Sequence, residues 1–158
     1  MSLHDIEAKV EQAFGELLTD VASELSLEVF QAISFEQFLN TAARGEGLFV
    51  SCPEANPMPN LDGNWRANVV IGSFTDTRSH ATGTLALEKH RERTSSVREI
   101  VLTEDLADQL NRLEVEDFTA LGFIIGRLRT FRVGLHIISA VEIQLDVTGS
   151  LVPETAPE

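Results

Sequence analysis

The sequence predicts an α+β domain, in which helices flank a mainly antiparallel sheet, and three observations predict it. Residues 3–25 repeat apolar side chains every three or four positions, which is typical of a helix with one buried face. Residues 65–74 and 134–147 alternate apolar and polar side chains, which favours strands with one exposed face. Helices and strands follow one another without regular β–α–β alternation, which argues against a parallel α/β fold.

The length of 158 residues fits a single domain, which we place at residues 1–150. A hydrophobic content of 43% is enough for a real core and argues against global disorder. Residues 151–158 are polar and contain two prolines, so we expect a C-terminal tail or arm there.

The remaining elements are expected in the following order. Strands are predicted at 27–33, 47–52, 65–74, 117–128 and 134–147, helices at 35–43, about 80–102 and 106–113, a long loop at 53–64, and turns at 75–79 and 129–133. Residues 82–88 also fit a strand, although we prefer one long helix there. Residues Thr103 to Asp105 suit the N-cap and first turn of the helix at 106–113.

The composition restricts the class of protein. The net charge of −13 argues against direct nucleic-acid binding, because affinity for phosphates is built from Lys and Arg. The sequence has no apolar run long enough for a membrane span, and its first residues lack the pattern of a signal peptide. One cysteine, Cys52, cannot form an internal disulfide or supply a cysteine zinc site, and we expect it to be buried. Synthesis and folding in a cytosol follow.

The titratable residues indicate no cofactor or metal. The four histidines, at 4, 80, 90 and 136, form no metal-binding spacing, and the sequence contains no phosphate-binding or nucleophile motif. Asp76 precedes His80 by four residues. This spacing fits a general acid–base pair, but we favour a helix cap with a charge contact between the two side chains.

Arg127, Arg129 and Arg132 form a basic cluster near a predicted hairpin tip in an otherwise acidic chain. One interpretation is a docking patch for an acidic surface, such as the first helix of a neighbouring copy. The other is a solvated hairpin whose arginines pair within their own subunit, and the sequence does not decide between the two.

The loop predicted at 53–64 is a second candidate contact surface. Long loops in compact domains often bind partners, so Pro57, Met58 and Pro59 are candidate interface residues.

The order and the residue patterns of these segments resemble those of the tail-terminator and tail-completion proteins of long-tailed bacteriophages. The resemblance covers roughly residues 3–150. It rests on the amphipathic first helix and on four segments, namely GLFVSCPEANP, WRANVVIGSFTDTRSH, VREIVLTEDLADQLNRL and FTALGFIIGRLRTFRVGLHIISAVEIQLDV. The Pro-rich loop and the tail after residue 148 depart from this pattern, which leaves the position within the tail or neck open.

The resemblance implies a non-enzymatic virion protein, assembled in the host bacterial cytoplasm. Such a protein forms a ring, expected to be a hexamer, at the head-proximal end of the tail and joins the tail tube to the head–tail connector. No catalytic residue or cofactor is carried over. Three alternatives stay open: another neck or head–tail joining protein, an intracellular adaptor that binds a partner through the 53–64 loop, and an enzyme that uses Asp76 and His80.

Overall fold

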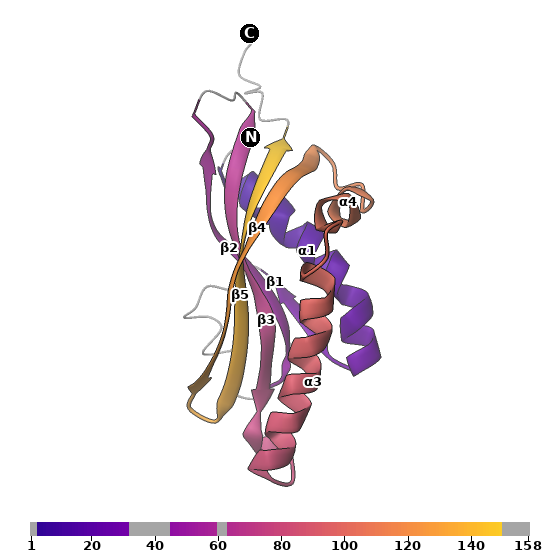
Figure 1. Ribbon diagram of the computed structural model, residues 1–158, viewed down its shortest axis with the longest axis vertical. Helices are drawn as coiled ribbons and strands as arrows, with labels where there is room; N and C mark the ends of the chain where they lie inside the picture. The colour runs from indigo at the N-terminus through magenta and orange to yellow at the C-terminus, as the bar shows by residue number, and fades with distance from the viewer. Residues whose placement is uncertain (1–2, 32–44, 60–62, 150–158) are drawn as a thin grey trace.

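The computed structural model describes residues 3–31, 45–59 and 63–149, which form one sheet with helices packed on one side of it (Figure 1). The elements are α1 (Leu3–Leu25), β1 (Glu28–Gln31), β2 (Gly47–Pro57), β3 (Asn64–Asp76), the 3-10 turn η2 (Thr77–Ser79), α3 (Gly83–Val101), α4 (Leu106–Asn111), β4 (Phe118–Val133) and β5 (His136–Gly149). The predicted order of helices and strands is confirmed over these residues.

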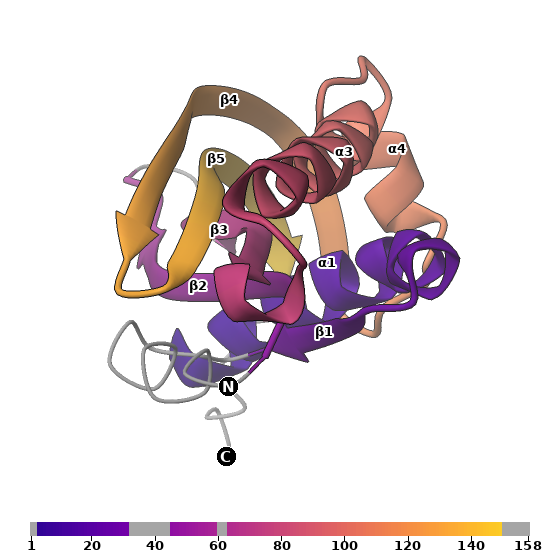
Figure 2. The ribbon, with the colours of Figure 1, turned by 90° about the horizontal axis from the view of Figure 1, so that it is seen from below.

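The sheet has the strand order β1-β2-β3-β5-β4, and its only parallel pairing within the described residues is that of β1 with β2. The predicted α+β class, with a mainly antiparallel sheet flanked by helices, is therefore confirmed. Figure 2 shows α1, α3 and α4 gathered on one side of the strands.

The central pairing of β3 with β5 is regular, whereas both neighbouring pairings are interrupted. All 13 residues of β3 pair with β5, from Asn64 opposite Thr148 to Asp76 opposite His136. The register shifts once between β2 and β3, after Ser51, and twice between β4 and β5, after residues 120 and 125. Such β-bulges bend a strand and increase its local twist, so β2 and β4, the strands on either side of the central pair, bend around a regular centre.

Side-chain alternation along the strands separates two faces. One face packs against the helices and forms the main core, in which Phe14, Leu18, Ile71 and Leu145 have no measurable exposure. The opposite face carries a smaller apolar cluster of Phe49, Phe74 and Ile138, with Phe30 packed against it.

The boundaries of α3 and α4 follow from local capping. The helix interpretation of residues 82–88 is confirmed, and α3 begins at Gly83 because the Thr82 hydroxyl accepts a hydrogen bond from the Leu85 N–H. Asp105 stands at the predicted N-cap of α4, but its carboxylate accepts from Gln109 and Thr103 side chains rather than from a backbone N–H.

Two predicted boundaries are wrong. The loop predicted at 53–64 is strand as far as Pro57, because the bulge after Ser51 lets β2 continue past Pro53, which has no N–H to donate. The turn predicted at 129–133 lies instead at Gly134 and Leu135, where Gly134 adopts a φ of +59°. The arginines of the predicted hairpin tip therefore belong to strand β4.

Some predictions fall outside the described residues. They are the short helix at 35–43, the tail at 151–158, and parts of the strand at 27–33 and of the loop at 53–64. Among the described helices, α1 and α3 carry too many charged side chains to be candidate membrane spans, and α4 is too short.

A substitution at Gly72 tests how closely the central strands pack. A Cβ at Gly72 would overlap the backbone carbonyl oxygen of Ser139 on β5, whereas a Cβ at Gly122 on β4 would meet nothing within 4 Å. We expect Gly72→Ala to lower the free energy of unfolding by about 1–3 kcal/mol or more, since overpacking strains a regular pairing. The measurement is urea unfolding followed by Trp65 fluorescence.

Gly122→Ala is the matched control. It makes the same chemical change in a strand with free space, so its free energy of unfolding should match that of the wild type or rise slightly. If both variants lost the same free energy of unfolding, the close approach of β3 and β5 at Gly72 would not be the cause of the loss.

Candidate functional site

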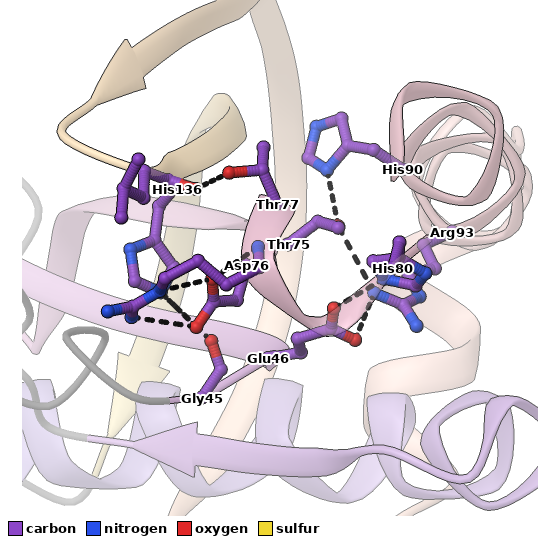
Figure 3. A network of polar contacts seen from close by, with 11 residues as sticks. Gly45, Glu46, Thr75, Asp76, Thr77, His80, His90, Arg93 and His136 are labelled. Atoms are coloured by element: carbon purple, nitrogen blue, oxygen red, sulfur yellow. Dashed lines mark hydrogen bonds and ion pairs between the residues drawn. The ribbon is translucent and has the colours of Figure 1, made fainter. Parts of the chain in front are cut away.

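The titratable side chains converge at the end of β3, in two groups on either side of the strand (Figure 3). In the first group, the Glu46 carboxylate lies between the His80 imidazole and the Arg93 guanidinium. His80 Nε2 lies 2.6 Å from one of its oxygens, and Arg93 Nη1 lies 2.8 Å from the other. Because Glu46 precedes β2 and Arg93 lies on α3, this carboxylate links the helix to the sheet.

The same guanidinium continues into a chain of hydrogen bonds. Arg93 Nη1 donates to the Thr75 hydroxyl at 3.1 Å, and that hydroxyl lies 2.9 Å from His90 Nδ1. His90 Nε2 lies 2.7 Å from the Ser139 hydroxyl, which contacts the Thr130 hydroxyl at 2.7 Å. We call this set the Glu46 network; its members are Glu46, Thr75, His80, His90, Arg93, Thr130 and Ser139.

The hydrogen bonds of His90 join the helix to two strands. Arg93 has no acceptor, so the Thr75 hydroxyl accepts from it. Thr75 and Ser139 occupy the two ring nitrogens of His90, and the tautomer of the imidazole decides which of these two contacts it donates and which it accepts. Burial, followed by the nearby Arg93 charge, lowers the pKa of His90 to about 4, so the imidazole is neutral near pH 7.

The contact between His90 and Ser139 bears on catalysis. A serine with a histidine at hydrogen-bonding distance resembles a nucleophile with its general base, and both residues line a groove of about 350 Å³ between α3 and the β4–β5 hairpin. A general base must accept the serine proton, and the lowered pKa of His90 makes its imidazole a weak base. Ser139 is also only 1% exposed. The geometry favours a structural link over a nucleophile.

The second group surrounds Asp76, on the other side of β3. Its carboxylate accepts from the Arg78 side chain at 2.9 and 2.8 Å and from the Arg78 N–H at 2.9 Å. These hydrogen bonds from Arg78 hold the pKa of Asp76 below its ordinary value, against the opposing effect of burial. His136 Nε2 lies 3.8 Å from the carboxylate and 3.1 Å from the Gly45 carbonyl.

Asp76 and His80 therefore belong to different groups, since His80 is part of the Glu46 network and Asp76 bonds to Arg78. Asp76 caps η2 through the Arg78 N–H, so the predicted cap is confirmed. The predicted charge contact between Asp76 and His80 is wrong, because His80 pairs with Glu46. Sequence reasoning missed Glu46 and Arg93, whose partners lie far away along the chain. Across the described residues, no three His, Cys, Asp or Glu side chains are placed to hold a metal ion, and every buried polar side-chain atom has a hydrogen-bond partner.

Cys52 agrees with its prediction. Its side chain is buried in the main core on β2. Burial, together with the charges of Glu11 and Glu7, raises the pKa of this thiol to about 12. A thiol in this state is protonated and inert near pH 7.

The three predicted interface arginines lie on β4, at one edge of the sheet. Arg127 sits in the second bulge, Arg129 pairs with Ala140, and Arg132 pairs with Ile137. Because Ala140 and Ile137 point to opposite faces of β5, Arg129 and Arg132 do too. All three are exposed, and none forms an ion pair with another described residue.

Pro57, Met58 and Pro59 lie at the opposite end of the sheet from the β4–β5 turn, so the structure does not bring the two predicted sets together. Pro57 ends β2 opposite Trp65, and the Met58 N–H donates to the Asn64 carbonyl at 2.9 Å. Pro57 and Pro59 are exposed, and Met58 is half-buried. These residues form the start of the β2–β3 hairpin loop rather than part of a long free loop.

The edge strand β4 has a feature that the sequence did not predict. Asn111, the last residue of α4, receives the Ala120 N–H at 2.7 Å and donates to the Ala120 carbonyl at 3.0 Å. Its amide thus occupies the place of a neighbouring strand at one residue. Four of the six exposed large apolar side chains in the described structure lie on β4 or its turn, namely Leu121, Ile124, Phe131 and Leu135.

A wide groove of about 500 Å³ also crosses the helix-free face of the sheet, between the bulges of β2 and β4. Glu54, Asn68, Ile124 and Glu142 are among the residues that line it. Glu54 accepts hydrogen bonds there from Asn68 and Asn56, at 2.7 and 3.2 Å. The groove therefore has a mixed lining whose polar groups already bond to one another.

Comparison with known proteins identifies no family for this chain. No protein-family model matches the sequence, and no curated protein matches it significantly. The functional inference therefore rests on the geometry described above and on the resemblance noted in the sequence.

The state of His90 predicts a pH dependence of stability. Its pKa is about 4 in the folded chain against an ordinary value of 6.5, so between these values the unfolded chain binds a proton that the folded chain does not. The free energy of unfolding should therefore fall as the pH drops from about 6.5 to about 4. Urea unfolding at several pH values should show a smaller fall in His90→Gln.

The Asp76 carboxylate gives the free energy of unfolding a separate pH dependence at lower pH. This dependence should be present in both the wild type and His90→Gln. The pKa of this carboxylate is lowered on folding, so the stability that it adds is lost as the pH falls through and below its ordinary value of 3.8. Curves for wild type and His90→Gln that stay parallel between pH 4 and 6.5 would contradict the buried neutral state of His90.

Proposed function

We propose that this chain is a non-enzymatic structural subunit of a bacteriophage virion, a tail-terminator or tail-completion protein. It forms a ring of identical subunits, expected to be a hexamer, at the head-proximal end of the tail. There it joins the tail-tube protein to the head–tail connector proteins. Its assembly takes place in the host bacterial cytoplasm.

The observation that carries this proposal is the long, exposed edge strand β4. It spans 16 residues at one end of the sheet, and Ile124 is 66% exposed and Phe131 39% exposed on it. An edge strand presents unpaired N–H and C=O groups that pair readily with another chain, and exposed apolar side chains mark contact surfaces. Both features suit a protein that works by contact with other proteins.

The arrangement of the polar side chains supports the same proposal. The Glu46 network and the Asp76 group bond mainly within themselves, and both ring nitrogens of His90 are held by hydroxyl groups of the sheet. The chain uses these residues to hold α3 and η2 against the sheet. Such a rigid framework can present the same surfaces repeatedly, as a ring of identical subunits requires.

Native mass spectrometry and light scattering of the purified chain test the proposal. Over a concentration series from about 1 to 500 μM, whose upper end lies far above the dissociation constants of specific assemblies, we expect a closed oligomer of one size. Electron microscopy of that species should show rings. A chain that stays monomeric or dimeric up to the highest concentration would contradict a ring subunit and favour the adaptor alternative.

The genes beside this one provide a second test, directed at the virion role. Flanking genes for capsid and tail-tube proteins are the expected result. An oligomeric ring encoded among metabolic genes would keep the self-assembly and reject the tail assignment.

A further inference from the structure

The two edges of the sheet carry opposite charge. Residues 3–31, which form α1 and β1 at one edge, contain seven acidic residues and one basic residue, Lys9. Strand β4 at the other edge contains three arginines and no acidic residue. In the strand order β1-β2-β3-β5-β4, β1 and β4 are the two outer strands, and α1 packs against β1 and β2.

The acidic edge has an exposed stripe of acidic side chains, none of which forms an ion pair with another described residue. Glu16, Asp20 and Glu24 are spaced by four residues along α1, so they lie about 6 Å apart along one side of the helix. All three are exposed, and the last turn of α1 has no basic residue. Like charges at this spacing and acidic residues at a helix C-terminus both destabilise a helix, so α1 maintains this stripe at a cost.

The single base of this segment does not neutralise the stripe. Lys9 Nζ donates to the Glu116 carbonyl at 2.7 Å and lies 3.7 Å from the Asp117 carboxylate, in the segment that leads into β4. Among the described residues, no basic side chain forms an ion pair with the stripe, and a second subunit can supply one.

The basic edge is open along most of its length. Asn111 occupies the edge only at Ala120, and the arginines follow seven or more residues later. In the described structure, no other strand pairs with the outer side of β4. Backbone groups that lack a strand partner therefore lie beside three arginines that lack an ion-pair partner.

We infer that the β4 edge of one subunit docks against the α1–β1 edge of a second copy of this chain. Arg127, Arg129 and Arg132, which flank the β4 backbone on both faces of the sheet, then lie against the acidic edge that carries Glu16, Asp20 and Glu24. This inference rests on the proposed self-assembly and names its two surfaces. The contact is heterologous, because each copy presents a different surface to each of its neighbours. Heterologous contacts form a ring when the rotation between neighbours closes, and an open filament when it does not.

Charge favours this contact over a symmetric one. Pairing of two β4 strands would place arginines against arginines, and like charges opposite each other in a sheet are destabilising. Pairing of two α1–β1 edges would set two acidic surfaces together. Only the head-to-tail contact matches a basic surface with an acidic one.

Two charge-reversal variants test the inference on the full chain. The first carries Arg127→Glu, Arg129→Glu and Arg132→Glu, and the second carries Glu16→Lys, Asp20→Lys and Glu24→Lys. All six positions are exposed, so the fold should tolerate the changes, which circular dichroism checks. Each variant alone should be monomeric at concentrations where the wild type is fully assembled, because each then brings like charges together.

An equimolar mixture of the two variants is the decisive measurement. Every contact between unlike subunits is again complementary in charge, so the mixture should form oligomers in which the two variants alternate. Native mass spectrometry should show these oligomers with equal numbers of the two variants. A symmetric β4 contact would give only one-to-one dimers from the mixture and would leave the second variant assembled by itself. Either of those outcomes overturns the inference.

A matched control separates surface position from total charge. Arg91→Glu, Arg98→Glu and Arg112→Glu make the same change in net charge at exposed positions on and next to α3 and α4. This variant should assemble like the wild type. If the wild type assembles and the two reversals do not impair it, the docking surfaces are wrong while self-assembly stands. If the wild type itself never assembles, the proposed function fails as well.

Discussion

The uninterrupted pairing of β3 with β5 is the constraint from which the other features of the structure follow. Thirteen residue pairs run in register through the centre of the sheet, and Gly72 lets the two backbones approach closely at Ser139. Because the central pair is regular, the bending of the sheet occurs in the neighbouring strands β2 and β4, which contain the bulges. Because β4 is an outer strand, its edge stays exposed, and the alternation of side chains points Arg129 and Arg132 to different faces.

The Glu46 network anchors α3 to this central pair. Thr75 lies on β3 and Ser139 on β5, and His90 reaches both from the helix. A buried network is stabilising only when each donor meets an acceptor, and hydrogen bonds connect Arg93 without a gap to Thr130 on β4. One network thus connects the helix layer with three strands, which holds the exposed β4 edge in a fixed position.

Local patterns in the sequence predicted the helices and strands, but they did not predict the contacts between residues that are distant in the sequence. The periodicity of α1 and the alternation in β3 and β5 predicted those elements, because burial of one face dictates both patterns. The turn at Gly134 was misplaced because the strand signal of β4 continues through its arginines, and only the positive φ of one glycine ends it. Glu46 was overlooked because its partner Arg93 is 47 residues away, and charge alone does not identify a partner. The interface role of the arginines stays a prediction.

A net charge of −13 opposes self-association, since identical acidic chains repel one another. Assembly of such a chain requires a local surface of the opposite sign, and the distribution of arginines meets this requirement. Three of the ten arginines lie on one edge strand that has no acidic residue of its own, while Arg66, Arg78 and Arg93 pair with carboxylates of their own subunit. The unpaired arginines therefore lie where the backbone is also unpaired. Edge geometry and charge select the same surface independently, and this agreement is the physical reason to expect β4 at the contact between subunits.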